Sequence, residues 1–225
     1  MEKLKEYRNL LISYLEVQRR IVKYNVELFE NLLEGYLTSY QLYFEKNRVV
    51  TPNFNPLVLL NLKFDELTHS NILGWAFDPY GTHNQGDLFF KNFLEFFHFK
   101  VFYENWDYKV RREYSGHESI IDILVYGKNF IFYIENKTLT PEGYDQTDRE
   151  YRDLMRLSKS LNIRDENIFP IFLSPTGEKP RNENWIPISY YQLARTFEKA
   201  LSQIRGNYVQ LFMKSWLTTL ESLEA

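Results

Sequence analysis

The segment from Ser119 to Lys137 constrains the fold more than any other part of the chain. Two apolar runs, rich in β-branched and aromatic residues, flank a Gly-Lys-Asn turn, and this pattern predicts a β-hairpin. Three charged residues, Asp122, Glu135 and Lys137, stand in or directly after these runs. Burying an ionised side chain costs free energy unless the charge is paired or bound to a metal. The three charges therefore need a partner or a ligand.

The length of the turn decides which of these charges face each other. With a two-residue loop, Gly127 pairs with Phe130, and counting back along the strands places Asp122 directly opposite Glu135. A four-residue loop gives the same pairing, whereas a three-residue loop does not unless a bulge restores it. Opposed carboxylates repel each other. A divalent cation between them, with Lys137 alongside, would make the arrangement favourable, and oxygen ligands suit Mg²⁺ or Mn²⁺.

Composition limits the classes of function. The chain has 225 residues and 17% aromatic side chains, which is enough for a sizeable core. Its net charge of −3 gives no overall basic field, so nucleic-acid binding would need a local basic surface. There is no Cys, which excludes disulfides, thiolate catalysis and Cys-bound zinc. The sequence shows neither a signal-peptide core nor an apolar run long enough for a membrane span, and we expect a cytoplasmic protein.

Two domains are expected from the organisation of the chain. Residues 1–50 are predicted to be a helical extension, because apolar side chains recur at steps of three and four. Such a helical layer most often packs on a core, and the alternative is an arm that binds a partner protein or a second copy of the chain as a homodimer. A Pro-containing linker follows, and residues 58–225 are expected to form an α/β domain.

Helices and strands alternate around the predicted hairpin. Helices are expected over residues 65–77, after Asp87 as N-cap, and over residues 144–160, 191–204 and 208–223. Strands are expected over residues 103–114, at the edge of the sheet, and over residues 168–173. Residues 185–188 follow a Pro/Gly loop and carry no strand assignment. The order of elements predicts an α/β fold whose αβββαβ core has a mixed central sheet between helices.

The charges of the hairpin have a structural and a functional explanation. The structural one is an ion pair within the sheet. The functional one is a metal site for hydrolysis, where the metal binds a phosphate oxygen and lowers the pKa of a water. Lys137 would orient that water or stabilise the charged transition state. The central position of the hairpin in the predicted core favours the functional explanation.

The pattern formed by Asp122 and Glu135-Asn136-Lys137 resembles the PD-(D/E)XK nuclease superfamily, which has a restriction-endonuclease-like fold. Further motifs resemble one uncharacterised prokaryotic branch of it, in order and in spacing, over about Phe64 to Leu173. These motifs are E-x-x-H-S from Glu66 to Ser70, D-P-x-G-x-H from Asp78 to His83, I-D-I from Ile121 to Ile123, I-E-N-K from Ile134 to Lys137, and Q-x-x-R-x-Y from Gln146 to Tyr151.

The resemblance implies an enzyme, a Mg²⁺- or Mn²⁺-dependent endonuclease or other DNA-binding nuclease, with assigned site residues. By this resemblance, Asp122 and Glu135 bind the metal, and Glu66 and the main-chain carbonyl of Asn136 complete its shell. Lys137 is then the catalytic lysine, and Gln146 lies beside the active site. The chain departs from the branch at two places. The branch has a basic residue just before the Asp, whereas here Ser119, Ile120 and Ile121 precede Asp122. The branch has Leu after the Gln, whereas here Thr147 follows Gln146.

Five further residues are candidates for substrate binding. His69 and Ser70 share a helical face with Glu66, although a histidine that packs the helix is an equal alternative for His69. His83 lies in a Gly-flanked loop. Arg149 and Arg152 begin a basic stripe that either contacts phosphates or forms a solvated face with intrahelical ion pairs.

Two hypotheses from different classes follow from the sequence. The first is a divalent-metal-dependent nuclease that hydrolyses phosphodiester bonds, in DNA rather than RNA. The second is a nucleic-acid- or protein-binding module on a nuclease-like scaffold without cleavage activity. The intact acidic set favours the first, since a binding module gains nothing from opposed carboxylates.

Overall fold

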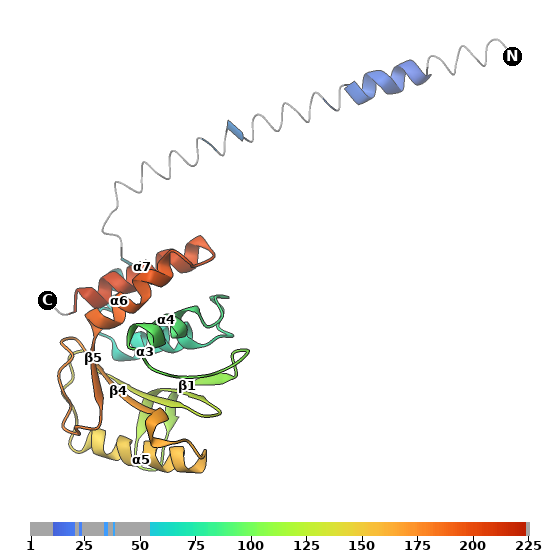
Figure 1. Cartoon of the computed structure of the whole chain (residues 1–225). Helices are drawn as coiled ribbons and strands as arrows, with labels where there is room; N and C mark the ends of the chain where they lie inside the picture. Colours follow the sequence, from blue (N-terminus) through green and yellow to red (C-terminus); the bar gives the residue numbers. More distant parts are fainter. Residues whose placement is uncertain (1–10, 21–22, 24–33, 36–37, 39–54, 224–225) are drawn as a thin grey trace, which may run out of the picture. The chain divides into compact units, whose positions relative to one another are not determined.

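The computed structural model describes residues 11–20, 23, 34–35, 38 and 55–223. The chain divides into two units, Met1–Phe54 and Asn55–Ala225. In the first unit, residues 11–20 are helical (Figure 1). Most of the expected helical extension lies outside the described residues. Whether it packs on a core or binds a partner therefore stays a prediction.

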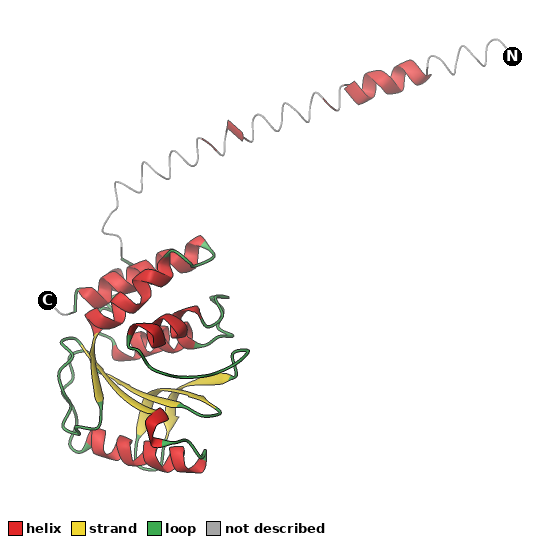
Figure 2. Cartoon of the chain, viewed as in Figure 1, coloured by secondary structure: helices red, strands yellow, loops and turns green. Residues whose placement is uncertain are grey.

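A five-stranded mixed sheet with the strand order β1-β2-β3-β4-β5 is the centre of the second unit (Figure 2). The strands are β1 (Tyr108–Ser115), β2 (Ile120–Gly127), β3 (Ile131–Asn136), β4 (Ile168–Ser174) and β5 (Ile186–Ser189). The first three strands run antiparallel to their neighbours, whereas β4 and β5 continue the sheet in parallel with β3. The predicted α/β fold with a mixed sheet is confirmed.

Helices cover both faces of this sheet (Figure 1). They are α2 (Pro56–Leu59), α3 (Glu66–Phe77), α4 (Leu88–Phe96), α5 (Gln146–Ser160), α6 (Tyr190–Leu201) and α7 (Asn207–Glu221). The helices α3, α4, α6 and α7 lie on one face and α5 lies on the other. None of the helices in the described ranges combines the length and the apolar character needed to cross a bilayer.

Strand β3 is buried along its whole length and separates two cores. Phe132 and Ile134 point into the larger core beneath α3 and α4, while Ile131 and Tyr133 belong to the smaller core beneath α5. This alternation follows from the two-residue period of a strand. Two fully covered faces explain why the segment reads as an unbroken apolar run.

The hairpin between β2 and β3 has the shorter of the expected loops. The Gly127 amide donates to the Phe130 carbonyl at 3.1 Å, so two residues form the turn. The ladder runs on to the pair Ile123 and Ile134. One further step in this register brings Asp122 opposite Glu135, which is the pairing expected from the sequence.

Two parts of the sheet differ from the sequence-based expectation. Strand β5 contains Pro187, which cannot donate a ladder hydrogen bond and is tolerated because β5 is an edge strand. Strand β1 begins at Tyr108, later than expected. The backbone before it takes left-handed φ angles at His98, Asn105 and Trp106, which interrupts an extended conformation.

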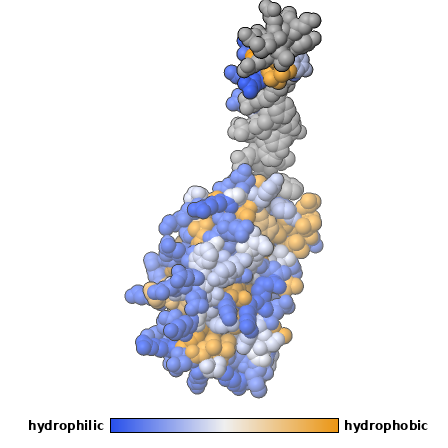
Figure 3. Space-filling view, turned by 90° about the vertical axis from the view of Figure 1, so that its right-hand side faces the viewer, coloured by the Kyte–Doolittle hydropathy of each residue, from blue (hydrophilic) through white to orange (hydrophobic). Residues whose placement is uncertain are grey.

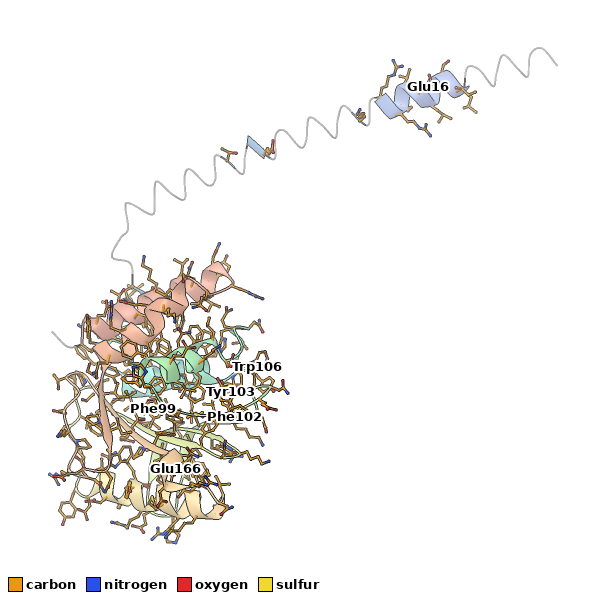
Figure 4. All side chains as sticks on the ribbon, viewed as in Figure 1. Glu16, Phe99, Phe102, Tyr103, Trp106 and Glu166 are labelled. Atoms are coloured by element: carbon orange, nitrogen blue, oxygen red, sulfur yellow. The ribbon has the colours of Figure 1, made fainter. Side chains whose placement is uncertain are left out.

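The loop before β1 is rich in aromatic residues, among them Phe99, Phe102 and Trp106 (Figure 4). Together with α4 it lines a surface cavity of about 620 Å³ that includes Tyr103 but none of the hairpin charges. Viewed from the right-hand side of Figure 1, the molecular surface is mostly hydrophilic with separate hydrophobic patches (Figure 3).

Candidate active site

The charged residues of the hairpin meet further polar residues at the carboxyl end of β3. Asp122 comes from the start of β2, Glu135 from the end of β3, and Lys137 follows directly. Glu66 is the first residue of α3 and Gln146 is the first residue of α5. The structure therefore brings together five residues that are spread over 81 positions of the sequence, from 66 to 146.

Glu135 is the most buried carboxyl group of this cluster, with 3% of its surface exposed. Its Oε1 atom lies 2.9 Å from Lys137 Nζ and accepts a hydrogen bond from Gln146 Nε2. Burial raises the pKa of Glu135 well above its ordinary value, and the nearby charges of Asp122 and Glu150 raise it further. Lys137 opposes this shift but does not cancel it.

Asp122 lies where the β2–β3 ladder ends. Its Oδ2 atom accepts a hydrogen bond of 2.8 Å from the Asn136 amide, which takes the place of a further backbone pair. Burial raises the pKa of Asp122 to about 6, although the Asn136 amide and Lys137 both act to lower it. For the carboxyl groups of both Asp122 and Glu135, burial is the main cause of the raised pKa, and neighbouring carboxylates add to it.

Lys137 and Glu66 close one side of the cluster. Lys137 Nζ lies 3.9 Å from Glu66 Oε2, and the Lys137 amide donates to the Leu173 carbonyl at 2.8 Å, which holds the backbone in the sheet. Glu66 Oε1 accepts a hydrogen bond of 3.0 Å from the Thr138 amide. Burial lowers the pKa of Lys137, but the charges of Glu135 and Glu66 outweigh burial and raise it overall.

Asn136 fastens this end of β3 to two helices. Its side-chain amide donates to the Glu66 carbonyl and to Ser70 Oγ, each at 3.0 Å, and its Oδ1 atom accepts the hydroxyl of Tyr190. The side chain is 1% exposed and fully used by protein partners. The family resemblance implies that only the main-chain carbonyl of Asn136 reaches the metal, and this stays a prediction.

Glu150 is a carboxyl group of the site that the sequence analysis did not single out. Gln146 Nε2 donates both to Glu135 Oε1 and, at 2.9 Å, to Glu150 Oε1, while Gln146 Oε1 accepts the Gly143 amide at 3.1 Å. The second oxygen of Glu150 is buried without a hydrogen-bond partner. Burial raises the pKa of Glu150 to about 8. Its spacing of four from Gln146 was the available signal, since such residues share a helical face.

The donor set fits a hard divalent cation. Lys137 and Gln146 contact Oε1 of Glu135, and Asn136 contacts Oδ2 of Asp122, so these contacts leave the other oxygen of each carboxylate for a ligand. Across the described ranges, no three His, Cys, Asp or Glu side chains already form a group that could hold a metal. Mg²⁺ commonly binds one or two carboxylates and takes its remaining ligands from water and substrate phosphates.

The two candidate histidines and Ser70 have protein partners. His69 is buried; its Nε2 lies 2.8 Å from the Lys63 carbonyl, and its Nδ1 accepts the Trp216 indole N–H at 3.0 Å. His83 is also buried and contacts the Asp78 carbonyl at 3.0 Å. Because burial lowers the pKa of His69 and of His83, neutral packing histidines are favoured over substrate contacts. Ser70 Oγ donates to the Glu66 carbonyl at 2.9 Å.

The cations of α5 are largely engaged by the protein itself. Arg152 forms two hydrogen bonds of 3.1 and 2.7 Å with Glu118, and Arg156 pairs with the same carboxylate. Arg149 donates to the Tyr144 carbonyl at 2.6 Å. Within residues 55–223, Arg156 forms an intrahelical ion pair with Asp153 at 3.1 Å, whereas Arg149 and Arg152 form none within the helix.

Comparison with known proteins assigns the family. No curated protein and no solved structure matches this chain. The family model described as the PD-(D/E)XK nuclease superfamily matches residues 54–217, which is most of the chain and all of the sheet with its charged cluster. Members of this superfamily are usually nucleases, and their typical use of divalent metals agrees with the oxygen donors found here. The chain belongs to the PD-(D/E)XK nuclease superfamily.

Proposed function

We propose that this protein is a nuclease that hydrolyses phosphodiester bonds of DNA with Mg²⁺ or Mn²⁺. The observation that carries the proposal is the meeting of Asp122, Glu135 and Lys137 in one buried cluster of a superfamily member. A purely structural ion pair would need only one carboxylate for Lys137, whereas several carboxyl groups surround it. The surplus of carboxyl groups with raised pKa values favours a site that is completed by a cation.

The proposed ligands of the cation are Asp122 and Glu135, with Glu66 and the Asn136 carbonyl beside them. When bound, the cation would polarise the phosphoryl group and lower the pKa of a bound water. The hydrogen bond from the Asn136 amide holds the Asp122 carboxylate at the end of the strand. Gln146 holds Glu135 from the side of α5, so that both carboxylates keep fixed orientations.

Lys137 is proposed as the catalytic cation. Because the nearby carboxylates raise its pKa overall, its amine stays protonated at neutral pH. It therefore acts as a hydrogen-bond donor that orients a water or stabilises charge on the phosphoryl oxygens, and not as the base that removes a proton.

The proposal is tested by incubating the full chain with plasmid DNA and with single-stranded DNA in Mg²⁺ or Mn²⁺, with and without chelator. Cleavage is expected with metal and not with chelator. Glu135→Ala and Lys137→Ala are expected to lower the rate by at least about a hundredfold, since the first removes a proposed metal ligand and the second removes the cation that acts on the phosphoryl group. Cleavage that survives these substitutions would overturn the assigned roles.

A binding module without cleavage is the alternative outcome of the same assay. In that case DNA or a protein partner binds, chelator has no effect, and Glu135→Ala leaves binding unchanged.

A further inference from the structure

The candidate active site is itself strongly acidic. Lys137 Nζ lies 2.9 Å from Glu135 and 3.9 Å from Glu66, and its charge also acts on the carboxyl groups of Asp122 and Glu150. The chain as a whole also has a net charge of −3. Without a bound cation, these carboxylates repel a DNA backbone, so affinity for the phosphates that flank the site must come from Lys and Arg side chains nearby.

The basic stripe of α5 is poorly suited to supply that affinity. Arg156 contacts Glu118 at 2.5 Å and Asp153 at 3.1 Å, and Arg152 contacts Glu118 at 2.7 Å. A phosphate would have to compete with these carboxylates for the same guanidinium groups. Their positive charge is largely balanced within the protein.

Strand β1 carries a second set of cations that is not balanced in this way. Lys109, Arg111 and Arg112 are all exposed on this edge strand. Within residues 55–223, which the structure describes without a gap, none of the three takes part in an ion pair. These three residues are called the β1 cations below.

Two of the β1 cations pack against neighbouring elements, one over an aromatic ring and the other against a helix. The guanidinium carbon of Arg111 lies 5.8 Å from the centre of the Tyr126 ring on the neighbouring strand. The stem of Arg112 covers Gly74 of α3, where an added Cβ would lie only 2.8 Å from Arg112 Cδ. Gly74 thus allows the arginine to lie against the helix. Side chains that are already ordered lose less entropy when they bind a ligand.

The β1 cations extend away from the catalytic cluster. Arg112 pairs with Ile123, the residue after Asp122, and Arg111 pairs with Leu124. Neighbouring strands are about 4.8 Å apart and successive residues rise about 3.3 Å, so the Cα atoms of Arg112 and Asp122 are roughly 6 Å apart. Side chains alternate along a strand, so Arg111 and Lys109, which pair with Leu124 and Tyr126, lie on the face of the sheet that carries Asp122, whereas Arg112 lies on the opposite face against α3.

We propose that β1 is a DNA-binding edge, at which Arg112, Arg111 and Lys109 bind backbone phosphates that flank the scissile phosphate. The identity of the scissile position rests on the proposed function, whereas the binding of duplex DNA by this edge does not require cleavage. The competing explanation is that edge-strand cations only prevent pairing with the edge of another sheet. That explanation predicts no effect on DNA affinity.

The experiment measures binding of a short fluorescent DNA duplex by anisotropy over a series of salt concentrations. The full chain carries Glu135→Gln, so that the duplex stays intact. Removing one phosphate contact is expected to lower the slope of log affinity against log salt by about 1. Arg111→Ala/Arg112→Ala should therefore lower the slope by about 2 and weaken binding by about tenfold or more.

Two control proteins separate charge at this edge from general effects. Arg111→Lys/Arg112→Lys keeps both charges and should retain the slope. Arg195→Ala removes an exposed arginine on α6 that pairs with Glu198, and it should bind as the parent does. Thermal unfolding shows whether each variant folds. If Arg111→Ala/Arg112→Ala does not fold, the single variant Lys109→Ala or Arg111→Ala takes its place.

Each outcome decides the proposal separately from the cleavage assay. Unchanged affinity and salt slope in the β1 variants, or no binding of duplex by the Glu135→Gln protein, would overturn it. Self-association of the β1 variants with unchanged DNA affinity would assign the cations to protection of the edge. Loss of binding in the β1 variants supports the DNA-binding edge even if the parent chain cleaves no DNA.

Discussion

At the scale of single residues, hydrogen bonds link the side chains of the candidate site to one another. Gln146 is fixed by three partners: its carbonyl accepts the Gly143 amide, and its amide reaches Glu135 and Glu150. Such support fixes the orientation of Glu135, which would otherwise be repelled by the carboxylates around it. Glu150 therefore acts on the site through Gln146.

Glu150 gives the first prediction. Glu150→Leu leaves one Gln146 amide hydrogen without its acceptor, and we expect DNA cleavage to fall by about 10–100-fold with KM little changed. Glu150→Gln still offers a side-chain carbonyl to Gln146 and should retain most of the activity. Steady-state cleavage kinetics of both variants make the check. Equal losses in the two variants would show that the negative charge of Glu150, and not its role as acceptor, is what matters.

Asp122 gives a prediction about pH in the absence of divalent metal. Its pKa is raised to about 6 in the folded chain from an ordinary value of 3.8, so the folded state favours the protonated carboxyl. The resulting stabilisation is present in full below pH 3.8 and is lost as the pH rises through about 6. In chelator, Asp122→Asn should therefore raise the melting temperature at pH 8 by about 5 °C, and by less at pH 5. A lower melting temperature at pH 8 would contradict this assignment of the burial cost.

At the scale of elements, the β2–β3 hairpin and α5 are joined by Asp153. Its buried Oδ2 atom accepts the amides of Glu118 and Ser119, at 2.8 and 2.9 Å, and the Ser119 hydroxyl at 2.8 Å. These bonds fix the segment that leads into β2 three residues before Asp122. Although burial acts to raise the pKa of Asp153, the hydrogen bonds outweigh it and lower the pKa overall.

Asp153→Ala is expected to destabilise the fold by about 2–4 kcal/mol, since it removes a buried acceptor on which three hydrogen bonds converge. With a lowered pKa, the Asp153 contribution is present above pH 3.8 and is lost as the pH falls through the lower folded value. Urea unfolding of the variant and the parent chain at pH 7 measures the difference. The matched control is Glu166→Gln, which removes an exposed carboxylate paired with Arg164 and should change stability by less than about 0.5 kcal/mol.

The elements also show what the sequence could and could not predict. The hairpin follows from periodicity and turn chemistry, and so does the pairing of Asp122 toward Glu135 for a loop of two or four residues, but the choice of the two-residue loop comes from the structure. Strand β5 was missed because Pro187 argues against a strand, and only its place at the sheet edge makes it acceptable. The partner of Arg152 could not be foreseen, because Glu118 is distant in sequence and meets α5 only through the tertiary structure.

At the scale of the whole molecule, the fold concentrates negative charge in one place and leaves positive charge at another. The acidic cluster lies at the carboxyl end of β3, and exposed cations follow the adjacent edge strand β1. The sheet holds both because β1 pairs with β2, the strand that carries Asp122. A cation in the cluster would relieve the mutual repulsion of the carboxylates and stabilise the folded state by mass action.

The stabilising effect of metal gives the last of the stability predictions. Millimolar Mn²⁺ at pH 8 is expected to raise the melting temperature of the parent chain by several degrees, or about 1–3 kcal/mol. The same addition should change Asp122→Asn/Glu135→Gln very little, because both carboxylate ligands are gone. Differential scanning fluorimetry compares the two proteins, with Ca²⁺ as a further hard cation. An equal rise in both would place the stabilising ion elsewhere on the molecule.

The most direct test of the central claim is the position of Mn²⁺ in crystals of the parent chain, located by its anomalous scattering. The account predicts one ion between the carboxylates of Asp122 and Glu135, with Glu66 within reach through one water and Lys137 beside the metal-bound water. A crystal in saturating Mn²⁺ without an ion at this position, and with Lys137 and Gln146 still the sole partners of Glu135, would contradict the assignment of the cluster as a metal-dependent nuclease site.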